Sequence, residues 1–188
     1  MPPPTEKKYT AEEYLDLESK TGERYQFFNG EVFMMAGGSI GHTRICANVS
    51  GELRQRLCGK DYEAFGSELK IYLRRQNTYV YPQMAVVCGP LERVPKVPGA
   101  VSNPVLLVEN NLECLDRFYR CRRLPSLREY VLIDQSSYQV EVRYRRPDTD
   151  IWVSHFYEGL EATVELRSLE LTLPMHELYL HVEMDDLF

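Results

Sequence analysis

The sequence predicts an α/β (α+β) domain in which a mixed β-sheet is flanked by helices. Three observations lead to this fold class: a helical repeat of apolar residues in the first third of the chain, continuous apolar strands in the middle, and alternating strands toward the C-terminus. At 188 residues the chain is long enough for one well-buried core and short for two. We therefore expect residues 1–8 to form a flexible tail and residues 9–188 to form one domain.

A helix and a β-hairpin are predicted at the start of the domain. Thr10 followed by Glu13 is a capping-box pattern, which opens a helix that should run through about Leu17. Two apolar runs then flank Asn29-Gly30. Because an Asn-Gly pair readily adopts the left-handed conformations of a tight turn, these runs should pair as a hairpin.

A second helix is predicted over residues 41–58. Apolar residues recur there at every fourth position, which is typical of an amphipathic helix that packs on a sheet. This stripe consists of Ile45, Val49, Leu53 and Leu57. We expect it to face the core.

Strands are expected after this helix, at residues 62–73, 78–88 and 104–109. The last of them is a continuous apolar run, as in a central strand that is covered on both faces. The segment between the second and third strands, residues 89–103, is rich in proline and glycine and has no period. It is predicted to be a surface loop.

The second half of the chain predicts a crossover and a hairpin. Residues 116–123 read as a short basic helix between the strand that ends at 109 and another apolar strand at 129–134. Such a strand-helix-strand order implies a crossover connection. Residues 139–145 and 151–157 alternate around a Pro-Asp turn, which predicts an antiparallel hairpin, and a capped turn is expected at 174–179.

The composition excludes several classes of protein. With 44% hydrophobic and 27% charged residues the chain is neither disordered, collagen-like nor a coiled coil. No apolar run reaches the roughly 20 residues that a membrane helix needs, and residues 1–8 lack the apolar core of a signal peptide. We expect a cytoplasmic protein without a membrane partner. The net charge of −6 means that nucleic acid can bind only at a local basic patch.

Cysteine and histidine do not predict a zinc site. The five cysteines form no CxxC pair, and the four histidines lie at no zinc-finger spacing from them. An odd number of unpaired cysteines agrees with a reducing compartment. The cysteines are Cys46, Cys58, Cys88, Cys114 and Cys121.

Six strings of the sequence, in this order, resemble the Uma-two family, a restriction-endonuclease-like group with the PD-(D/E)XK nuclease fold. The resemblance covers about residues 9–179. The strings are Tyr9-Thr10-Ala11-Glu12-Glu13-Tyr14-Leu15, Arg24-Tyr25 with Asn29-Gly30-Glu31, Gly38 to His42, Tyr81-Pro82 before Met84-Ala85-Val86-Val87, Asn103-Pro104 leading to Val108-Glu109, and Leu124 to Asp134.

The resemblance implies metal-dependent hydrolysis of phosphodiester bonds in DNA. Clustered carboxylates in such sites hold magnesium or manganese, which activates an attacking water, and a lysine assists. This sequence departs from that pattern. Gln26 and Gln83 stand where the family has acids, Glu109 keeps the third acid and is the implied metal ligand, and Arg117 takes the place of the lysine. The family's segment directly after the last acid is also missing here.

These departures weaken the implied metal site. Magnesium is usually held through carboxylates and phosphates. At about 4 Å and an effective dielectric constant near 20, each lost charge pair removes about 4 kcal/mol of attraction for a unit charge. Arginine is a poor replacement for the lysine because it stays protonated and presents a planar fork. We therefore expect little or no hydrolytic activity.

Other residues were weighed as parts of the site. The helix at 116–123 carries four arginines and one aspartate, which gives three net positive charges. Arg120 and Arg122 are therefore candidate phosphate ligands. A solvated helix face explains these charges equally well. His42 is a candidate for substrate binding or for an ordinary helix-start role. Glu68-Leu69-Lys70 is a literal Glu-x-Lys, which we interpret as a solvent-facing edge pair.

Two hypotheses on function follow. In the first, the protein is a weakened nuclease that uses Glu109 with Gln83, Gln26 and Arg117, and magnesium or manganese is its cofactor. In the second, it is a non-catalytic module of the same fold, without a cofactor, that acts in binding or assembly as a homodimer. Because a fold alone does not decide function, both remain open at this point.

Overall fold

The computed structural model describes residues 8–34, 38–110 and 115–183. Its first half contains α1 (Ala11–Thr21), β1 (Tyr25–Phe28), β2 (Glu31–Met34), α2 (Ile40–Leu57), β3 (Tyr62–Gly66), β4 (Lys70–Leu73), η1 (Arg74–Gln76), β5 (Thr78–Val80), β6 (Met84–Cys88) and β7 (Ala100–Val101). Its second half contains β8 (Pro104–Glu109), α3 (Leu115–Cys121), β9 (Glu129–Ile133), β10 (Gln139–Arg145), β11 (Trp152–Glu158), β12 (Thr163–Leu166), η2 (Arg167–Leu169), β13 (Leu171–Pro174) and α4 (Met175–Leu178).

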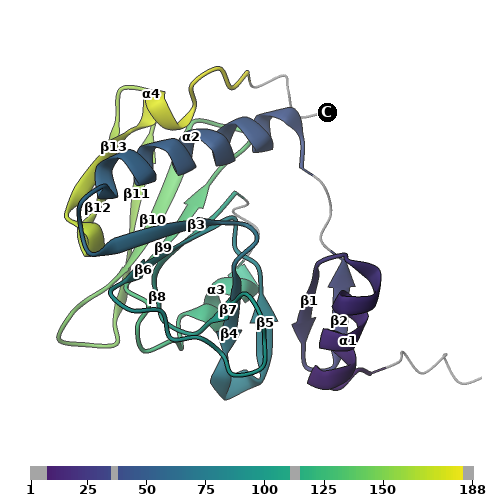
Figure 1. The fold of residues 1–188 in the computed structure, drawn as a ribbon. Coiled ribbons are helices and arrows are strands. Elements are labelled where there is room, and N and C mark those ends of the chain that lie inside the picture. The colour runs from purple at the N-terminus through teal and green to yellow at the C-terminus, as the bar shows by residue number, and fades with distance from the viewer. Residues whose placement is uncertain (1–7, 35–37, 111–114, 184–188) are drawn as a thin grey trace, which may run out of the picture.

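Two sheets and a two-stranded ribbon form the framework (Figure 1). The larger sheet has six strands in the order β11-β10-β9-β8-β6-β3, and the smaller has five in the order β2-β1-β5-β4-β7. In the larger sheet β8 and β9 pair in parallel across α3, and the other neighbours pair antiparallel. The predicted crossover is thus confirmed, and the fold is a mixed α+β arrangement as expected.

The structure corrects the expectation of long strands at 62–73 and 78–88. Each breaks in the middle, and its two halves join different sheets: β3 and β6 lie in the larger sheet, β4 and β5 in the smaller. The second break falls at Pro82, which has no N–H to donate to a ladder. The expected mixed sheet is present, but a second mixed sheet lies beside it, because the sequence pattern does not reveal a change of partner sheet.

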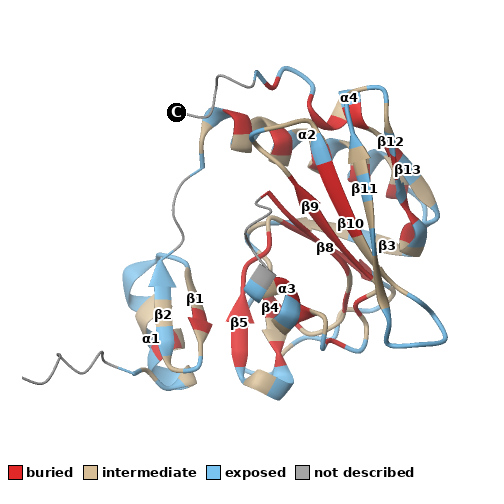
Figure 2. Ribbon diagram, turned by 180° about the vertical axis from the view of Figure 1, so that it is seen from behind, coloured by how far each residue is buried: buried red, intermediate tan, exposed pale blue. Residues whose placement is uncertain are grey.

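Helix α2 and the C-terminal ribbon cover one face of the larger sheet. The four apolar residues predicted to face the core are at most 3% exposed, and they contact alternate residues of β6, β8, β9 and β10. Ser39 caps this helix by accepting a hydrogen bond from the backbone N–H of His42 at 3.1 Å. Figure 2 shows the central strands buried and the outer surfaces of the helices exposed.

The smaller sheet covers the opposite face of the larger one. Ile71, Val80 and Val101 from the smaller sheet contact Leu107 and Leu132 of the larger sheet, and α3 packs into the same cluster. The other face of the smaller sheet packs against α1. The layers therefore run from α2 through the larger and smaller sheets to α1, which accounts for the apolar runs 105–108 in β8 and 130–133 in β9.

The local signals at the N-terminus are confirmed. Thr10 and Glu13 form the reciprocal capping box, with hydrogen bonds of 2.8 and 3.1 Å. Asn29 and Gly30 have φ values of 49° and 86°, as the tight turn requires. Helix α1 is longer than expected, however, because it continues to Thr21 and ends at Gly22 in the left-handed conformation.

The two ends of the domain and the long loop contain more regular structure than the sequence predicts. Most of the expected tail, residues 1–7, lies outside the described residues, and at Tyr9 the backbone N–H already donates to Gly30 at 2.7 Å. The predicted loop 89–103 contains a short buried strand, β7, that pairs in parallel with β4. The predicted turn at 174–179 contains the short helix α4.

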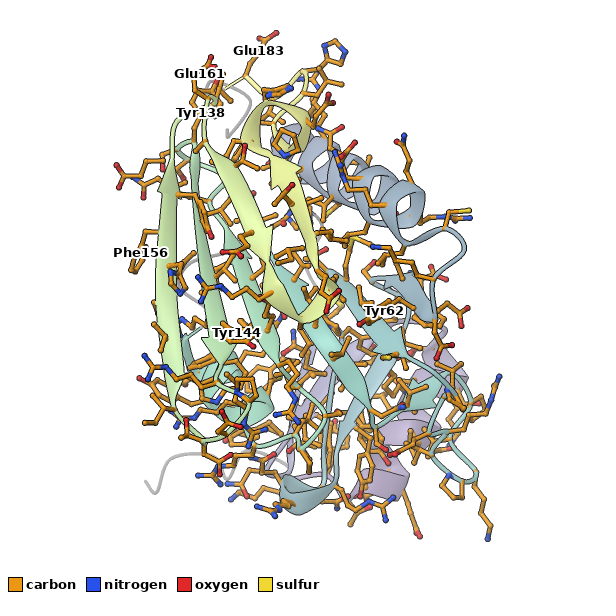
Figure 3. All side chains as sticks on the ribbon, turned by 90° about the vertical axis from the view of Figure 1, so that its left-hand side faces the viewer. Tyr62, Tyr138, Tyr144, Phe156, Glu161 and Glu183 are labelled. Atoms are coloured by element: carbon orange, nitrogen blue, oxygen red, sulfur yellow. The ribbon has the colours of Figure 1, made fainter. Side chains whose placement is uncertain are left out.

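Strands β11 and β3 form the two edges of the larger sheet. Figure 3 shows Phe156 projecting outward from β11, where it is 70% exposed. At the other edge, the hydroxyl of Tyr62 on β3 donates to the backbone oxygen of Ser168 at 3.2 Å and so ties this edge to the C-terminal segment (Figure 3). No helix among the described residues is long and apolar enough to span a membrane.

A buried ion pair joins α1 to the smaller sheet. The ammonium of Lys70 on β4 contacts the carboxylate of Glu18, and the two side chains are only 7% and 10% exposed. The same ammonium lies 5.2 Å from the ring centroid of Tyr14 and 5.6 Å from that of Tyr81. The Tyr81 hydroxyl also donates to Glu18 at 3.0 Å. Lys70 is therefore a structural residue and not part of a solvent-facing pair.

We predict that Lys70→Ala lowers the free energy of unfolding by about 3–5 kcal/mol, because Glu18 is then left buried without its cation. Urea denaturation measures this change. Lys20→Ala is the matched control, since Lys20 and its partner Asp16 are 72% and 58% exposed and such a pair contributes at most about 1 kcal/mol. Equal effects of the two variants would contradict the prediction.

Candidate functional site

Three of the predicted site residues meet where β8 ends. Gln83 directly precedes β6, and Glu109 is the last residue of β8. These two strands are antiparallel neighbours with Met84 opposite Val108, so Gln83 and Glu109 are brought face to face. The backbone N–H of Gln83 donates to the Glu109 carboxylate. Arg117 reaches the same point from α3, on the crossover that leaves β8.

Glu109 and Arg117 form a buried ion pair. Arg117 Nη1 donates to Glu109 Oε1 at 2.7 Å, and the two side chains are 18% and 3% exposed, respectively. Burial raises the pKa of the Glu109 carboxyl above its ordinary value, while the Arg117 guanidinium and the Gln83 N–H act in the opposite direction. The Glu109 carboxylate is thus already paired with a cation of the chain itself.

Neutral polar groups from α2 complete the cluster. The Cys46 thiol donates to Gln83 Oε1 at 3.4 Å and accepts from Asn110 Nδ2 at 3.1 Å. The His42 side chain is hydrogen-bonded to Gln83, and the backbone oxygen of His42 accepts from Asn110 Nδ2 at 3.3 Å. Asn110 and Gln83 therefore use their amides to tie α2 to the ends of the strands.

The His42 ring is held against the chain just before α2. A Cβ atom on Gly38 would lie 2.2 Å from the His42 Cδ2 atom, which is far inside van der Waals contact. Only glycine at position 38 leaves room for the ring in this position. The close approach gives a physical reason for the glycine-rich string that leads into α2.

Neither of the two titratable groups that α2 contributes to the cluster, Cys46 and His42, is activated. Burial raises the pKa of the Cys46 thiol to about 11, so the thiolate that would act as a nucleophile is scarce at neutral pH. Burial lowers the pKa of His42 below its ordinary value, although its hydrogen bond to Gln83 acts in the opposite direction. The imidazole is therefore neutral at pH 7. The cluster provides hydrogen bonds but no poised acid, base or nucleophile.

The cluster does not fit a divalent metal ion. Metal sites for magnesium are built from several anionic oxygens, whereas Gln83 presents a neutral amide whose oxygen already accepts from Cys46. Glu109 is paired with Arg117 and is 3% exposed. Throughout residues 8–34, 38–110 and 115–183, no group of three or more His, Cys, Asp or Glu residues is arranged to hold a metal.

The remaining predicted residues lie around this cluster in different settings. Gln26 is on β1, and strand alternation places it on the same face as Phe28. The Arg120 guanidinium stacks on the Phe28 ring, 3.2 Å from its centroid, and lies 3.9 Å from Asp116. Arg120 therefore links α3 to the hairpin. Arg122 instead faces a separate surface cavity.

The literal Glu-x-Lys triplet does not contribute to the cluster. Glu68 lies in the turn before β4, is 82% exposed and pairs with Arg24 at 2.9 Å. Lys70 opens β4 and is buried against α1. The interpretation of both residues as a solvent-facing edge pair is correct for Glu68 and wrong for Lys70, because the two do not share a strand face.

Sequence patterns missed Cys46, Asn110 and Gln135 as parts of the cluster. Gln135 Nε2 donates to the backbone oxygen of Asn110 at 2.6 Å. A weak signal existed for Asn110, which directly follows the predicted metal ligand. Cys46 looked like an ordinary neighbour of the apolar stripe on α2, and nothing in the sequence linked it to Gln83. The segment expected to lack the family's residues, 111–114, lies outside the described residues.

A comparison with known families identifies the chain. The sequence profile of the Uma2 family, described as "Putative restriction endonuclease", matches residues 11–177. The protein belongs to the Uma2 family. The sequence-based assignment to this restriction-endonuclease-like family is thereby confirmed. Restriction-endonuclease-like families are typically metal-dependent.

Relatives and a solved structure agree with this assignment. Two uncharacterised proteins of Synechocystis sp. are each 30% identical to the chain, one over 173 residues that cover 89% of the chain and 97% of the relative, the other over 178 residues that cover 92% of each. A crystal structure described as that of "a putative nuclease belonging to DUF820", from Anabaena variabilis, has a TM-score of 0.69 at 16% identity. It covers 93% of this chain and 99% of its own, and it supports the fold.

We predict that stability falls on acidification partly through His42. The unfolded chain has a His42 pKa near the ordinary value of about 6.5, whereas the folded value is lower. As the pH falls from about 6.5 toward the lower folded pKa, the unfolded state binds more protons than the folded state, so the free energy of unfolding decreases.

His42→Asn should therefore lose less stability than the unmodified protein between pH 8 and pH 5.5, as measured by urea denaturation. His176→Asn is the matched control, because the His176 side chain is 62% exposed. An unchanged pH dependence in His42→Asn would contradict the prediction.

We also predict that Arg117→Ala lowers the free energy of unfolding by about 3–5 kcal/mol, because it leaves the Glu109 carboxylate buried and unpaired. The double variant Arg117→Met with Glu109→Gln should recover most of this loss, since it removes both charges together. Denaturation in urea compares the three proteins. Arg24→Ala removes a pair that is 45% and 82% exposed and serves as the control. A double variant as unstable as Arg117→Ala would contradict the prediction that the unpaired Glu109 carboxylate causes the loss of stability.

Proposed function

We propose that this Uma2 protein binds nucleic acid without cutting it, because an internal ion pair has replaced the metal site of its fold. The observation that carries the proposal is the 2.7 Å contact between Arg117 and Glu109 in a buried setting. A guanidinium supplies the positive charge that a divalent ion would supply to this carboxylate, and it does so without water or substrate.

The chemistry of arginine supports the absence of hydrolytic activity. A nuclease of this class needs a group that positions or deprotonates water, and a metal that lowers the pKa of that water. Arg117 stays protonated at any working pH and cannot serve as a base. A metal ion would have to displace Arg117 from Glu109, which would leave the guanidinium unpaired near the ion. The lost attraction alone is about 4 kcal/mol for one close pair of unit charges.

Nucleic acid as the ligand is supported by two lines of argument. The family is described as "Putative restriction endonuclease", and the A. variabilis structure as that of "a putative nuclease". The chain also keeps a local cluster of arginines on and beside α3 despite its net charge of −6. A homodimeric assembly and a cytoplasmic location stay predictions from the sequence.

Two experiments test whether the unmodified protein cuts DNA and whether restored acids make a variant that does. The unmodified protein should not nick supercoiled DNA with magnesium or manganese between pH 6 and pH 9, and magnesium should not raise its melting temperature. The variant Gln26→Glu, Gln83→Asp, Arg117→Lys rebuilds the family's pattern. It should gain metal-dependent stabilisation and nicking, both abolished by a chelator.

Adding Glu109→Gln to the rebuilt variant is the matched control, and it should remove the recovered activity. Metal-dependent nicking by the unmodified protein that disappears in Glu109→Ala would overturn the proposal. DNA binding is measured separately, by fluorescence anisotropy in a chelator, so that binding and cutting are not confused.

A further inference from the structure

A surface cavity rich in arginine lies beside α3. Its volume is about 320 Å³, within the range of roughly 300–1,000 Å³ that is common for ligand sites. It is formed by η1, by α3 and the turn after it, and by the β10–β11 hairpin; Figure 1 shows α3 beside β4, at the end of which η1 begins. The lining residues are Arg75, Tyr119, Arg122, Arg123, Arg145, Asp150 and Trp152.

The cavity carries an excess of positive charge. Its lining has four arginines and one aspartate, and that aspartate, Asp150, pairs with Arg145. Arg75, Arg122 and Arg123 form no salt bridge with any carboxylate in the described part of the chain. Three guanidinium groups gathered without acidic partners, in a protein of net charge −6, point to an anionic ligand from outside.

The arginines are partly held in place before any ligand binds. Arg145 donates to Asp150 at 3.1 Å and to the backbone oxygen of Leu124 at 3.1 Å, and its side chain is 12% exposed. The Arg122 guanidinium lies 5.8 Å from the ring centroid of Tyr119. Arg75 and Arg123 are exposed at the rim. The base of the cavity is thus ordered, while its outer charges are accessible.

Two aromatic rings stand among these charges. Tyr119 is 55% exposed. Trp152 is fixed by an edge-to-face contact with Phe118, whose ring centroid is 5.2 Å away. A phosphate alone needs only the guanidinium forks. Aromatic faces next to a row of arginines are instead the combination that binds the bases and backbone of single strands.

We propose that this cavity binds a segment of single-stranded nucleic acid, with its phosphates on Arg75, Arg122 and Arg123 and a base against Tyr119 or Trp152. A duplex fits less well, because its bases are stacked within the helix and their faces are covered. The inference rests on the proposed function, in that the ligand is nucleic acid. It goes further by assigning a surface that contains neither Glu109 nor Arg117.

The chain provides its own probe for the base contact. Trp152 is the only tryptophan in the sequence, so its fluorescence reports on this cavity alone. Titration with an oligothymidylate in a chelator should quench this fluorescence. An abasic strand of the same length and charge should bind more weakly and leave the fluorescence almost unchanged, because it supplies phosphates without a base.

The role of the arginines is tested with the double variant Arg75→Ala, Arg123→Ala. Both side chains are exposed, so their loss should spare the fold. Anisotropy with labelled oligothymidylate should show affinity about tenfold weaker and a slope of log affinity against log salt smaller by about 0.7 per lost contact. The variant Arg54→Ala with Lys60→Ala removes the same charge from exposed sites near the end of α2 and should bind as the unmodified protein does.

The outcomes separate this inference from the proposed function. If DNA binds but the Arg75 and Arg123 variant binds equally well, the cavity is not the site, while the proposed function stands. If thymidine monophosphate binds as tightly as the strand, the ligand is a free nucleotide and the strand assignment fails. If a duplex binds more tightly than a single strand, the assignment also fails. If no nucleic acid binds, both proposals are overturned.

Discussion

The buried ion pair between Glu109 and Arg117 is the interaction on which the character of the site depends. It joins the end of β8 to α3 and so spans the crossover that builds the centre of the larger sheet. A carboxyl group buried at this depth must be protonated, paired with a cation or bound to a metal. The chain supplies the cation from its own helix, and the position is thereby closed to an external ion.

The neighbouring polar groups agree with this arrangement. Gln83 presents an amide whose oxygen accepts a hydrogen bond from Cys46 and whose neighbourhood includes a neutral His42. Asn110 ties the same groups to α2 through two hydrogen bonds. A metal-free cluster of this kind is internally consistent, because its polar groups are paired with one another and its single buried anion has a cationic partner.

The arginines of α3 and of the turn that follows it have different surroundings. Arg117 points into the fold and neutralises Glu109, and Arg120 stacks on the N-terminal hairpin. Arg122 and Arg123 face outward with arginines from η1 and β10. A single basic stretch in the sequence therefore has three different sets of surroundings.

Local structure could be predicted from the sequence where short-range physics dominates. The capping box at Thr10, the turn at Asn29-Gly30, the apolar stripe of α2 and the crossover after Glu109 each depend on neighbours within a few positions or on one simple period. The family was also readable, because it rests on recognisable strings, and the structure brings together Gln83, Glu109 and Arg117, which those strings had singled out.

What only the tertiary structure decided is which groups meet. The strands expected at 62–73 and 78–88 divide between two sheets, since alternation marks a strand but not its partner. Lys70 looked exposed until α1 supplied Glu18, and Cys46 had no visible link to Gln83. The sequence by itself determined most of the elements and the family. Tertiary packing decided burial and pairing, because these depend on contacts between residues tens of positions apart that no local pattern encodes.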